Sequence, residues 1–393
     1  MKLSSRAVRD PDVPNFNPPH QVPLVAASSF VFDTIEEGMA IFDGRQEGHI
    51  YGRFGNPTVD AAARKIAQLE GHGLAQEPAG LFCSSGMSAI ATVFLGLCEP
   101  GDVVLTQADL YGGTTSLLQQ LAKRNIGTET VDLRARAQVQ SKLEGNARIR
   151  LIYVETPSNP TLRVTDLAAL AELAHAHGAL LVTDNTFATP FVQRPLAWGA
   201  DVVVHSTTKF INGHGTGIAG AIVCRDAGLL HDKLTPVYRL YGGNGNAWDA
   251  WLVLNGLKTL PLRMERHSAN ANRVARFLAG EPQVVRVNYP GLPGHPDADV
   301  IGRQMEQTGG MLSFELGGGL AAGMAFMNRI KFCTLTPTLG DVDTLVLHPA
   351  SMSHRGVDPA VRRAHGISDG LVRLSVGVED VEDIMADLEQ ALG

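Results

Sequence analysis

Residues 179–209 read ALLVTDNTFATPFVQRPLAWGADVVVHSTTK and contain two apolar strand candidates, each followed by polar side chains. The run 179–182 ends just before Asp184, and the run 201–204 leads through hydroxyl residues to Lys209. Such short and nearly wholly apolar strands are typical of a parallel sheet that helices cover on both faces. Ligands of these sheets bind beyond the carboxyl ends of the strands. The segment therefore predicts an α/β fold with a binding site that includes Asp184 and Lys209.

The same alternation of strands and helices extends on both sides of this segment. Glycine and proline residues separate the runs, as expected for the turns between elements. We expect further strands at 81–83, 102–105, 148–154 and 220–224. We expect helices at 59–69, 86–97 and 116–123, and another that Thr165 caps and Gly178 ends.

The pattern changes at about residue 248, where longer helical segments begin. Helices are expected at 247–260 and 263–279, strands at 284–287 and 311–316, and a last helix at 380–392. The first residues are rich in proline, with one short helix at 34–42, and we expect them to lie against another surface. The sequence thus predicts an N-terminal arm at 1–50, a large domain at 51–247 and a smaller α+β domain at 248–393.

Composition and charge exclude several classes of function. Hydrophobic residues make up 44% of the 393 residues and the formal net charge is −7, which fits a globular protein without the basic surface that nucleic acids require. No apolar run reaches the length of a membrane span, and the N-terminus lacks the apolar core of a secretory signal. The four cysteines show neither metal-binding nor disulfide spacing. These features predict a cytoplasmic protein without a structural metal.

Lys209 and Asp184 have side chains suited to one kind of chemistry. A lysine amine can bond covalently to an aldehyde cofactor, and the hydroxyls of Ser206 and Thr208 are suited to hold phosphate oxygens beside it. A carboxylate at the end of the neighbouring strand can keep the ring nitrogen of a pyridoxal cofactor protonated. Taken alone, Lys209 is equally well a solvated loop residue, and Asp184 a helix cap or a buried ion-pair partner.

Two further turns carry candidate binding residues. The segment 84–89, SSGMSA, lies between a strand and a helix, where Gly86 lets backbone amides approach an anion. The segment 155–160, ETPSNP, presents Asn159 between two prolines. Small residues at such turns are common, and an ordinary turn explains Asn159 equally well when the segment is taken by itself.

Together these segments resemble the Cys/Met-metabolism, or trans-sulfuration, family of pyridoxal-phosphate enzymes. The family includes methionine and cystathionine γ-lyases, cystathionine γ-synthase and the O-acylhomoserine sulfhydrylases. The matching stretches span nearly the whole chain in order, at 51–58, 85–89, 111–114, 155–160, 184–186, 205–209, 213–215, 348–354 and 366–377. The resemblance implies the fold type I of pyridoxal-phosphate enzymes, with a largely parallel sheet of the seven-stranded type, helices on both faces, a smaller C-terminal domain and an N-terminal arm.

The resemblance also implies a role for each matching residue around the cofactor, pyridoxal 5'-phosphate. Lys209 would hold the cofactor and later move protons, Asp184 would pair with the ring nitrogen, and Tyr111 would stack on the ring. These three are the predicted catalytic residues. Further cofactor contacts are implied for Ser85, Gly86, Met87, Thr186, Ser206 and Thr208.

The remaining predicted site residues concern the partner subunit and the substrate. Tyr51 and Arg53 would reach the phosphate of a neighbouring subunit, which implies a dimer with shared active sites, usually doubled to a tetramer. Asn159, Thr338 and Arg373 would bind the amino-acid substrate. The planar guanidinium group of Arg373 matches the two oxygens of its carboxylate.

The family's chemistry leaves two reactions open. γ-Elimination from methionine, cystathionine or homocysteine gives 2-oxobutanoate, ammonia and a thiol. γ-Replacement on an O-acylhomoserine puts a thiol in the place of the acyloxy group, which leaves as a carboxylate. The compact length of the chain favours elimination. Gly113, the segment 238–241, Pro337 and Thr338 depart from residues typical of methionine γ-lyases or of many family members. Preference for methionine as the substrate therefore stays open.

A third hypothesis is a protein that binds the cofactor but serves a structural or regulatory partner. Lys209, Asp184 and Arg373 are all present, and a protein without catalytic activity has no need of the three together. The sequence therefore favours an enzyme.

Overall fold

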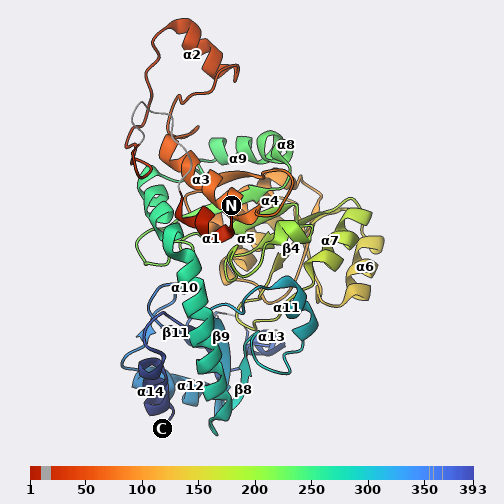
Figure 1. Ribbon diagram of the computed structural model, residues 1–393. Helices are drawn as coiled ribbons and strands as arrows, with labels where there is room; N and C mark the ends of the chain where they lie inside the picture. The colour runs from red at the N-terminus through yellow and green to blue at the C-terminus, as the bar shows by residue number, and fades with distance from the viewer. Residues whose placement is uncertain (10–18, 354, 357, 365) are drawn as a thin grey trace.

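The computed structural model describes residues 1–9, 19–353, 355–356, 358–364 and 366–393, which are arranged around two β-sheets (Figure 1). Several prolines of the predicted arm, within residues 10–18, lie outside the described residues. The larger sheet consists of β1 (Ala79–Cys83), β2 (Val103–Thr106), β3 (Gly127–Thr130), β4 (Ile149–Glu155), β5 (Leu180–Asp184), β6 (Val202–His205) and β7 (Gly220–Cys224). Their order is β1-β7-β6-β5-β4-β2-β3, and only β7 is antiparallel to its neighbours. The predicted α/β fold with a largely parallel seven-stranded sheet is confirmed.

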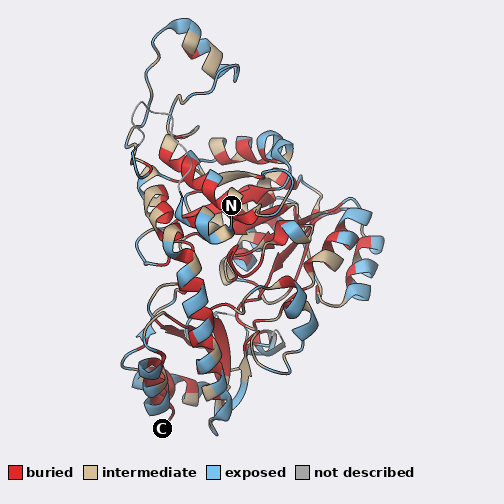
Figure 2. Cartoon of the chain, in the orientation of Figure 1, coloured by how far each residue is buried: buried red, intermediate tan, exposed pale blue. Residues whose placement is uncertain are grey.

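Helices cover both faces of this sheet, so its central strands are buried on both sides (Figure 2). Alternate residues of β4 show this, because Ile152 and Val154 belong to one hydrophobic cluster while Leu151 and Tyr153 belong to another. The covering helices are α3 (Pro57–Glu70), α4 (Gly86–Leu97), α5 (Gly112–Ala122), α6 (Arg136–Gly145) and α7 (Leu167–Ala176). The nearly continuous apolar runs of the sequence are the consequence of this double burial.

The pairing register brings the polar strand ends to one edge of the sheet. In the β4–β5 pair Glu155 lies opposite Asp184, and in the β5–β6 pair Asp184 lies opposite Val204. Because β5 and β6 are parallel, their carboxyl ends lie at the same edge of the sheet. The residues that follow β6, up to Lys209, therefore begin beside Asp184. The sheet thus collects the candidate site residues at the carboxyl ends of its central strands.

Two expectations about the helices are wrong. The cap of α7 is Asp166, whose carboxylate accepts a hydrogen bond from Ala169 N at 3.1 Å, and not Thr165. Thr165 is buried one residue earlier, where its backbone amide donates to Thr156 Oγ1. The helices expected at 247–260 and 263–279 form one helix, α10 (Ala247–Gly280), which contains Pro261. Pro261 removes only one backbone hydrogen-bond donor from the helix. Buried side chains before and after it, such as Leu260 and Met264, pack the helix against its neighbours.

The smaller sheet lies beside the second half of α10 (Figure 1). Its strand order is β10 (Thr334–Leu335), β11 (Leu345–Leu347), β12 (Leu371–Ser375), β9 (Met311–Leu316) and β8 (Val284–Asn288). All pairs except β10–β11 are antiparallel. The accompanying helices are α11 (Ala298–Gln304), α12 (Gly319–Arg329), α13 (Pro359–Ala364) and α14 (Val381–Leu392). This is the α+β arrangement expected for the C-terminal part of the chain.

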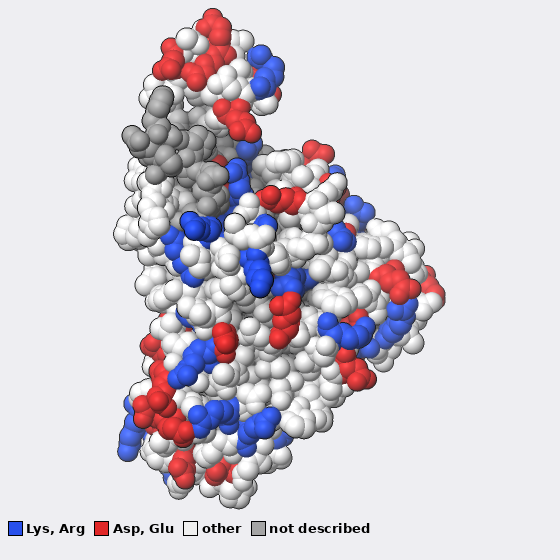
Figure 3. Space-filling view, in the orientation of Figure 1, with Lys and Arg blue, Asp and Glu red and all other residues white. Residues whose placement is uncertain are grey.

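The N-terminal segment follows a separate course. Helix α1 (Leu3–Val8) packs against α3 and α10, whereas α2 (Ile35–Phe42) stands away from both sheets, at the top of Figure 1. Short helical turns, α8 (Ala227–Leu229) and α9 (Thr235–Leu240), precede α10. Among the described residues no helix combines the length and hydrophobicity that crossing a membrane requires. On the face shown in Figure 3 the acidic and basic side chains of the described residues are intermingled.

Candidate active site

A cavity of about 300 Å³ lies at the carboxyl edge of the large sheet, between that sheet and the smaller one. It is lined by residues from loops that are far apart in the sequence, including Pro337 and Leu339 from the C-terminal part. Most of the predicted site residues meet here, namely Ser85, Gly86, Met87, Tyr111, Asn159, Asp184, Thr186, Ser206, Thr208, Lys209 and Arg373. The fold therefore gathers the side chains that the sequence singled out.

Lys209 lies at the centre of the candidate chemistry. Its Nζ donates a hydrogen bond to Thr338 Oγ1 at 2.7 Å, so the predicted site residue Thr338 contacts the lysine although it lies outside the lining of the cavity. Burial, with a smaller contribution from the Arg373 cation, lowers the pKa of the Lys209 amine to about 8. About a tenth of the amine is therefore unprotonated at pH 7, far more than for an ordinary lysine, and this fraction can act as a nucleophile or a base.

We expect Lys209→Met to stabilise the protein without cofactor at pH 7. The unfolded lysine keeps a pKa near 10.5, so below pH 8 folding must hold a partly buried cation at a cost of about 3 kcal/mol. This cost disappears as the pH rises from 8 to 10.5. Urea unfolding at one protein concentration should show a higher free energy of unfolding for Lys209→Met than for the wild type at pH 7. This difference should be smaller at pH 10. The exposed Lys233→Met variant is the control and should change neither value. A gain of the same size at both pH values would contradict the shifted pKa.

Asp184 is a half-buried carboxylate with neutral donors around it. Its Oδ2 accepts from the Tyr153 hydroxyl at 3.2 Å and its Oδ1 accepts from Thr186 N at 3.0 Å. Burial raises the pKa of the Asp184 carboxyl despite these bonds. Among the described residues it forms no ion pair, so it can take a cationic partner from the cavity, as a protonated pyridine nitrogen would be.

The start of α4 lines the cavity and is suited to bind an anion. Ser85 caps the helix by accepting from Ser88 N at 3.0 Å, and Gly86 is the first helical residue. A Cβ on Gly86 would lie only 2.7 Å from the Cβ of Ser206, so glycine is needed for this close approach. The helix start and the Ser206 hydroxyl can together hold a phosphate. Thr208 also lines the cavity, but its hydroxyl bonds to both the N and the O of Ala219.

Tyr111 is positioned by a residue that the sequence analysis missed. The carboxylate of Glu155 accepts from Tyr111 N at 2.9 and 3.0 Å, which fixes the loop before α5. Burial, and the negative charge of Asp184 opposite it in the sheet, raise the pKa of the Glu155 carboxyl well above its usual value. Its signal in the sequence is the same as that of Asp184, since both carboxylates end an apolar strand.

Arg373 reaches the cavity from β12 of the smaller sheet. The side chain is 6% exposed and donates to Asn159 Oδ1 at 3.3 Å and to the Thr338 carbonyl at 3.1 Å. Burial lowers the pKa of its guanidinium group to about 10. Among the described residues it has no carboxylate partner, so the cavity holds a buried cation that an anionic ligand can neutralise. The whole of β12 is buried, so Arg373 is not a surface arginine.

Tyr51 and Arg53 lie outside the lining of this cavity. Arg53 donates to the Arg239 carbonyl at 2.9 Å and its guanidinium group lies 4.6 Å from the centre of the Phe54 ring. Tyr51 is 45% exposed. A single chain therefore does not bring these two residues to its own site, and their predicted contact with a partner subunit stays a prediction.

A lysine and a carboxylate at the ends of adjacent strands, beside a helix start suited to bind an anion, fit pyridoxal phosphate and define the class of enzymes that depend on it. The chain belongs to the Cys/Met metabolism PLP-dependent enzyme family, whose sequence model matches residues 9–393. It is 43% identical over 373 residues to the L-methionine gamma-lyase of Fusobacterium nucleatum subsp. polymorphum, covering 94% of this chain and 93% of that protein. It is 40% identical over 374 residues to the O-succinylhomoserine sulfhydrylase of Pseudomonas aeruginosa, covering 95% and 91%.

Solved structures agree with this assignment. The crystal structure of cystathionine gamma synthase from Xanthomonas oryzae pv. oryzae, in complex with aminoacrylate and cysteine, has a TM-score of 0.92 and 41% sequence identity. The match covers 100% of this chain and 98% of that one. The predicted family, the pyridoxal-phosphate dependence and the fold are thus confirmed.

Proposed function

We propose that the protein removes the γ-substituent of a sulfur-containing amino acid and releases 2-oxobutanoate, ammonia and a thiol. The observation that carries this proposal is the cavity that joins the Lys209 amine to the unneutralised Arg373 cation. An amino acid has the carboxylate that such a cation can bind and the α-proton that such an amine can remove. The similarity to an L-methionine gamma-lyase over most of the chain supports the same reaction.

The polar side chains in and beside the cavity have separate parts in this proposal. Arg373 and Asn159 bind the substrate carboxylate and so orient the α-carbon toward Lys209. The Lys209 amine, directed by its bond to Thr338, accepts the α-proton and later returns protons to the substrate. Bound pyridoxal phosphate supplies the electron sink that makes the α-proton acidic, and Asp184 keeps its ring nitrogen charged.

γ-Replacement on an O-acylhomoserine is the second candidate function, and the surroundings of Gly113 favour it. Methionine γ-lyases typically carry a cysteine at this position. A Cβ on Gly113 would lie 2.4 Å from Tyr111 Cε1 and 2.9 Å from Met87 Sδ, so the ring of Tyr111 occupies the space of that side chain. The pocket therefore differs from that of typical methionine γ-lyases, and the relatives include a sulfhydrylase.

A product assay separates the two reactions. The enzyme is incubated with methionine, cystathionine, homocysteine, O-acetylhomoserine and O-succinylhomoserine, each with and without sulfide. We expect 2-oxobutanoate from at least one sulfur amino acid without sulfide, as quantified by chromatography. Sulfide-dependent homocysteine from an O-acylhomoserine, without 2-oxobutanoate from any sulfur amino acid, would contradict elimination and establish replacement.

We also propose that the protein forms a dimer with shared active sites, doubled to a tetramer. Helix α2 and the residues before it expose large apolar side chains, with Val31 95% and Phe42 65% exposed. Such a surface is costly in water, so a second copy of the chain is a suitable cover for it. Tyr51 and Arg53 lie outside the Lys209 cavity of the same chain, which supports the same arrangement.

Hybrid dimers test the shared site. Inactive Arg53→Ala and Lys209→Ala variants are mixed under conditions of subunit exchange. Each hybrid dimer should then have up to about half the activity of a wild-type dimer, because one of its two sites has both residues intact. Mixing Asp184→Ala with Lys209→Ala is the control and should restore none when both residues act within one chain. Absence of recovery in the first mixture, with exchange proven by mass spectrometry, would contradict sharing.

A further inference from the structure

A second cavity of about 440 Å³ lies at the same edge of the large sheet, beyond the ends of β2, β3 and β4. The smaller sheet closes it from the other side through Arg286 and Asn288 of β8. It shares no lining residue with the cavity around Lys209, and the proposed reaction uses none of its side chains. We call it the β2–β4 cavity.

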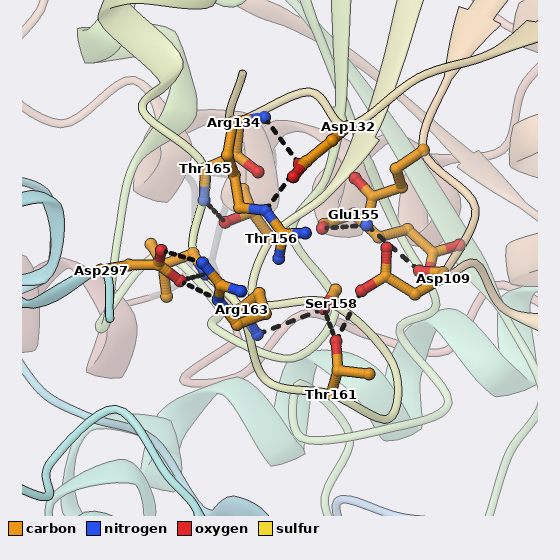
Figure 4. A network of polar contacts seen from close by, with 12 residues as sticks. Asp109, Asp132, Arg134, Glu155, Thr156, Ser158, Thr161, Arg163, Thr165 and Asp297 are labelled. Carbon is orange, nitrogen blue, oxygen red and sulfur yellow. Dashed lines mark hydrogen bonds and ion pairs between the residues drawn. The ribbon is translucent and has the colours of Figure 1, made fainter. Parts of the chain in front are cut away.

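One side of the β2–β4 cavity offers unused cationic donors (Figure 4). Arg163 uses Nε and one terminal nitrogen to bind Asp297, both at 2.7 Å, and Arg134 uses Nε to bind Asp132 at 2.7 Å. The other terminal nitrogen of Arg163 and both terminal nitrogens of Arg134 have no partner among the described residues. In Figure 4 the guanidinium group of Arg134 points toward the middle of the network, whereas that of Arg163 faces Asp297 at its left edge. Together they can bind a carboxylate.

The opposite side offers unused acceptors. Asp109 accepts from Thr161 Oγ1 at 2.5 Å through one carboxylate oxygen, and the other has no partner among the described residues. Gln107 is 6% exposed, and its amide nitrogen donates to the carbonyls of Asp109 and Glu155, both at 3.1 Å. These two acceptors fix the orientation of the amide, and its oxygen is buried without a partner. An ammonium group can satisfy both free oxygens.

The two loops that form this cavity also form the wall of the Lys209 cavity. Asp109 lines the β2–β4 cavity, whereas Tyr111 lines the other. Ser158 likewise lines the β2–β4 cavity, whereas Asn159 lines the other. Glu155 links the two faces of this wall, since its backbone carbonyl accepts from the Gln107 amide and its carboxylate accepts from the Tyr111 backbone N. A ligand that moves one face of the wall therefore moves residues that contact the substrate.

We propose that the β2–β4 cavity binds a free amino acid with a second acidic group and that this ligand changes substrate affinity at the Lys209 cavity. The α-ammonium group pairs with Asp109 and the Gln107 oxygen. One carboxylate lies between Arg134 and Arg163. The second reaches Arg286 at the rim, which also pairs with Glu315 at 3.4 Å. This site goes beyond the proposed reaction, because its ligand is not consumed.

Equilibrium dialysis of labelled L-glutamate against the holoenzyme tests the site. We expect saturable binding that leaves the visible absorbance of the bound cofactor unchanged, together with a change in the KM of the substrate. Arg134→Gln should weaken binding by about tenfold or more and remove the effect on KM, with basal kcat retained. The control is Arg136→Gln, which removes the same charge two positions later, outside the lining of the cavity, and should bind like the wild type.

Three results would overturn the proposal. The first is the absence of saturable binding by the wild-type holoenzyme. The second is glutamate binding that always alters the visible absorbance, because the ligand would then occupy the Lys209 cavity. The third is binding that Arg134→Gln leaves intact. Each of these results is independent of which reaction the enzyme catalyses.

Discussion

Replacing Lys209 with Ala should lower turnover on the order of ten-thousand-fold or more, with the fold intact. The lysine amine has two tasks in the proposed reaction, because it holds the cofactor and moves the protons of the substrate. No other described lysine lines the cavity, so no neighbour can take over either task. The pKa of about 8 is specific to the Lys209 amine, because burial and the nearby Arg373 cation lower it.

The experiment compares turnover, visible absorbance and circular dichroism of the Lys209→Ala and wild-type proteins. The variant should lose the visible band that a covalently held cofactor gives, and it should keep the circular dichroism spectrum. Lys233→Ala, which changes an exposed lysine, is the matched control and should retain full turnover. Near-normal turnover of Lys209→Ala would show that another group does the chemistry.

The sequence predicted the central strands well because they are buried on both faces and therefore apolar throughout. Strand β3 was not predicted, because it lies at the edge of the sheet. Thr128 and Thr130 are exposed there, so the strand has no apolar run. Helix α6 was missed because it buries only Val139 and Leu143. Edge elements carry too few buried side chains to leave a clear periodic signal.

The same physical limits apply to the candidate site. Asp184 and Lys209 were predictable because each follows an apolar strand, and Arg373 because its segment matched the family. Glu155 was not selected, since its role is to hold the backbone of Tyr111 and this contact depends on how two distant loops pack. The β2–β4 cavity was missed for a similar reason, because its lining combines loops that follow β2, β3 and β4 with residues of β8 in the smaller sheet.

Arg373→Lys should raise the KM for the substrate by about thirty- to a hundredfold, which corresponds to about 2–3 kcal/mol of lost binding energy. The guanidinium group spans Asn159 and the Thr338 carbonyl and still faces the cavity with its planar donors. A lysine amine is a single point of charge and cannot form two parallel bonds to a carboxylate while it keeps these contacts. Because Arg373 is buried, water cannot compensate for the lost bond.

The distribution of the effect between KM and the cofactor is what tests the assignment. Arg373 should contact the substrate and not pyridoxal phosphate, so Arg373→Lys should keep the visible absorbance while KM rises more than kcat falls. Arg329→Lys makes the same change at an exposed position of α12 and should leave KM unchanged. A wild-type KM in Arg373→Lys, or loss of the cofactor from it, would mean that the buried cation neutralises something other than the substrate carboxylate.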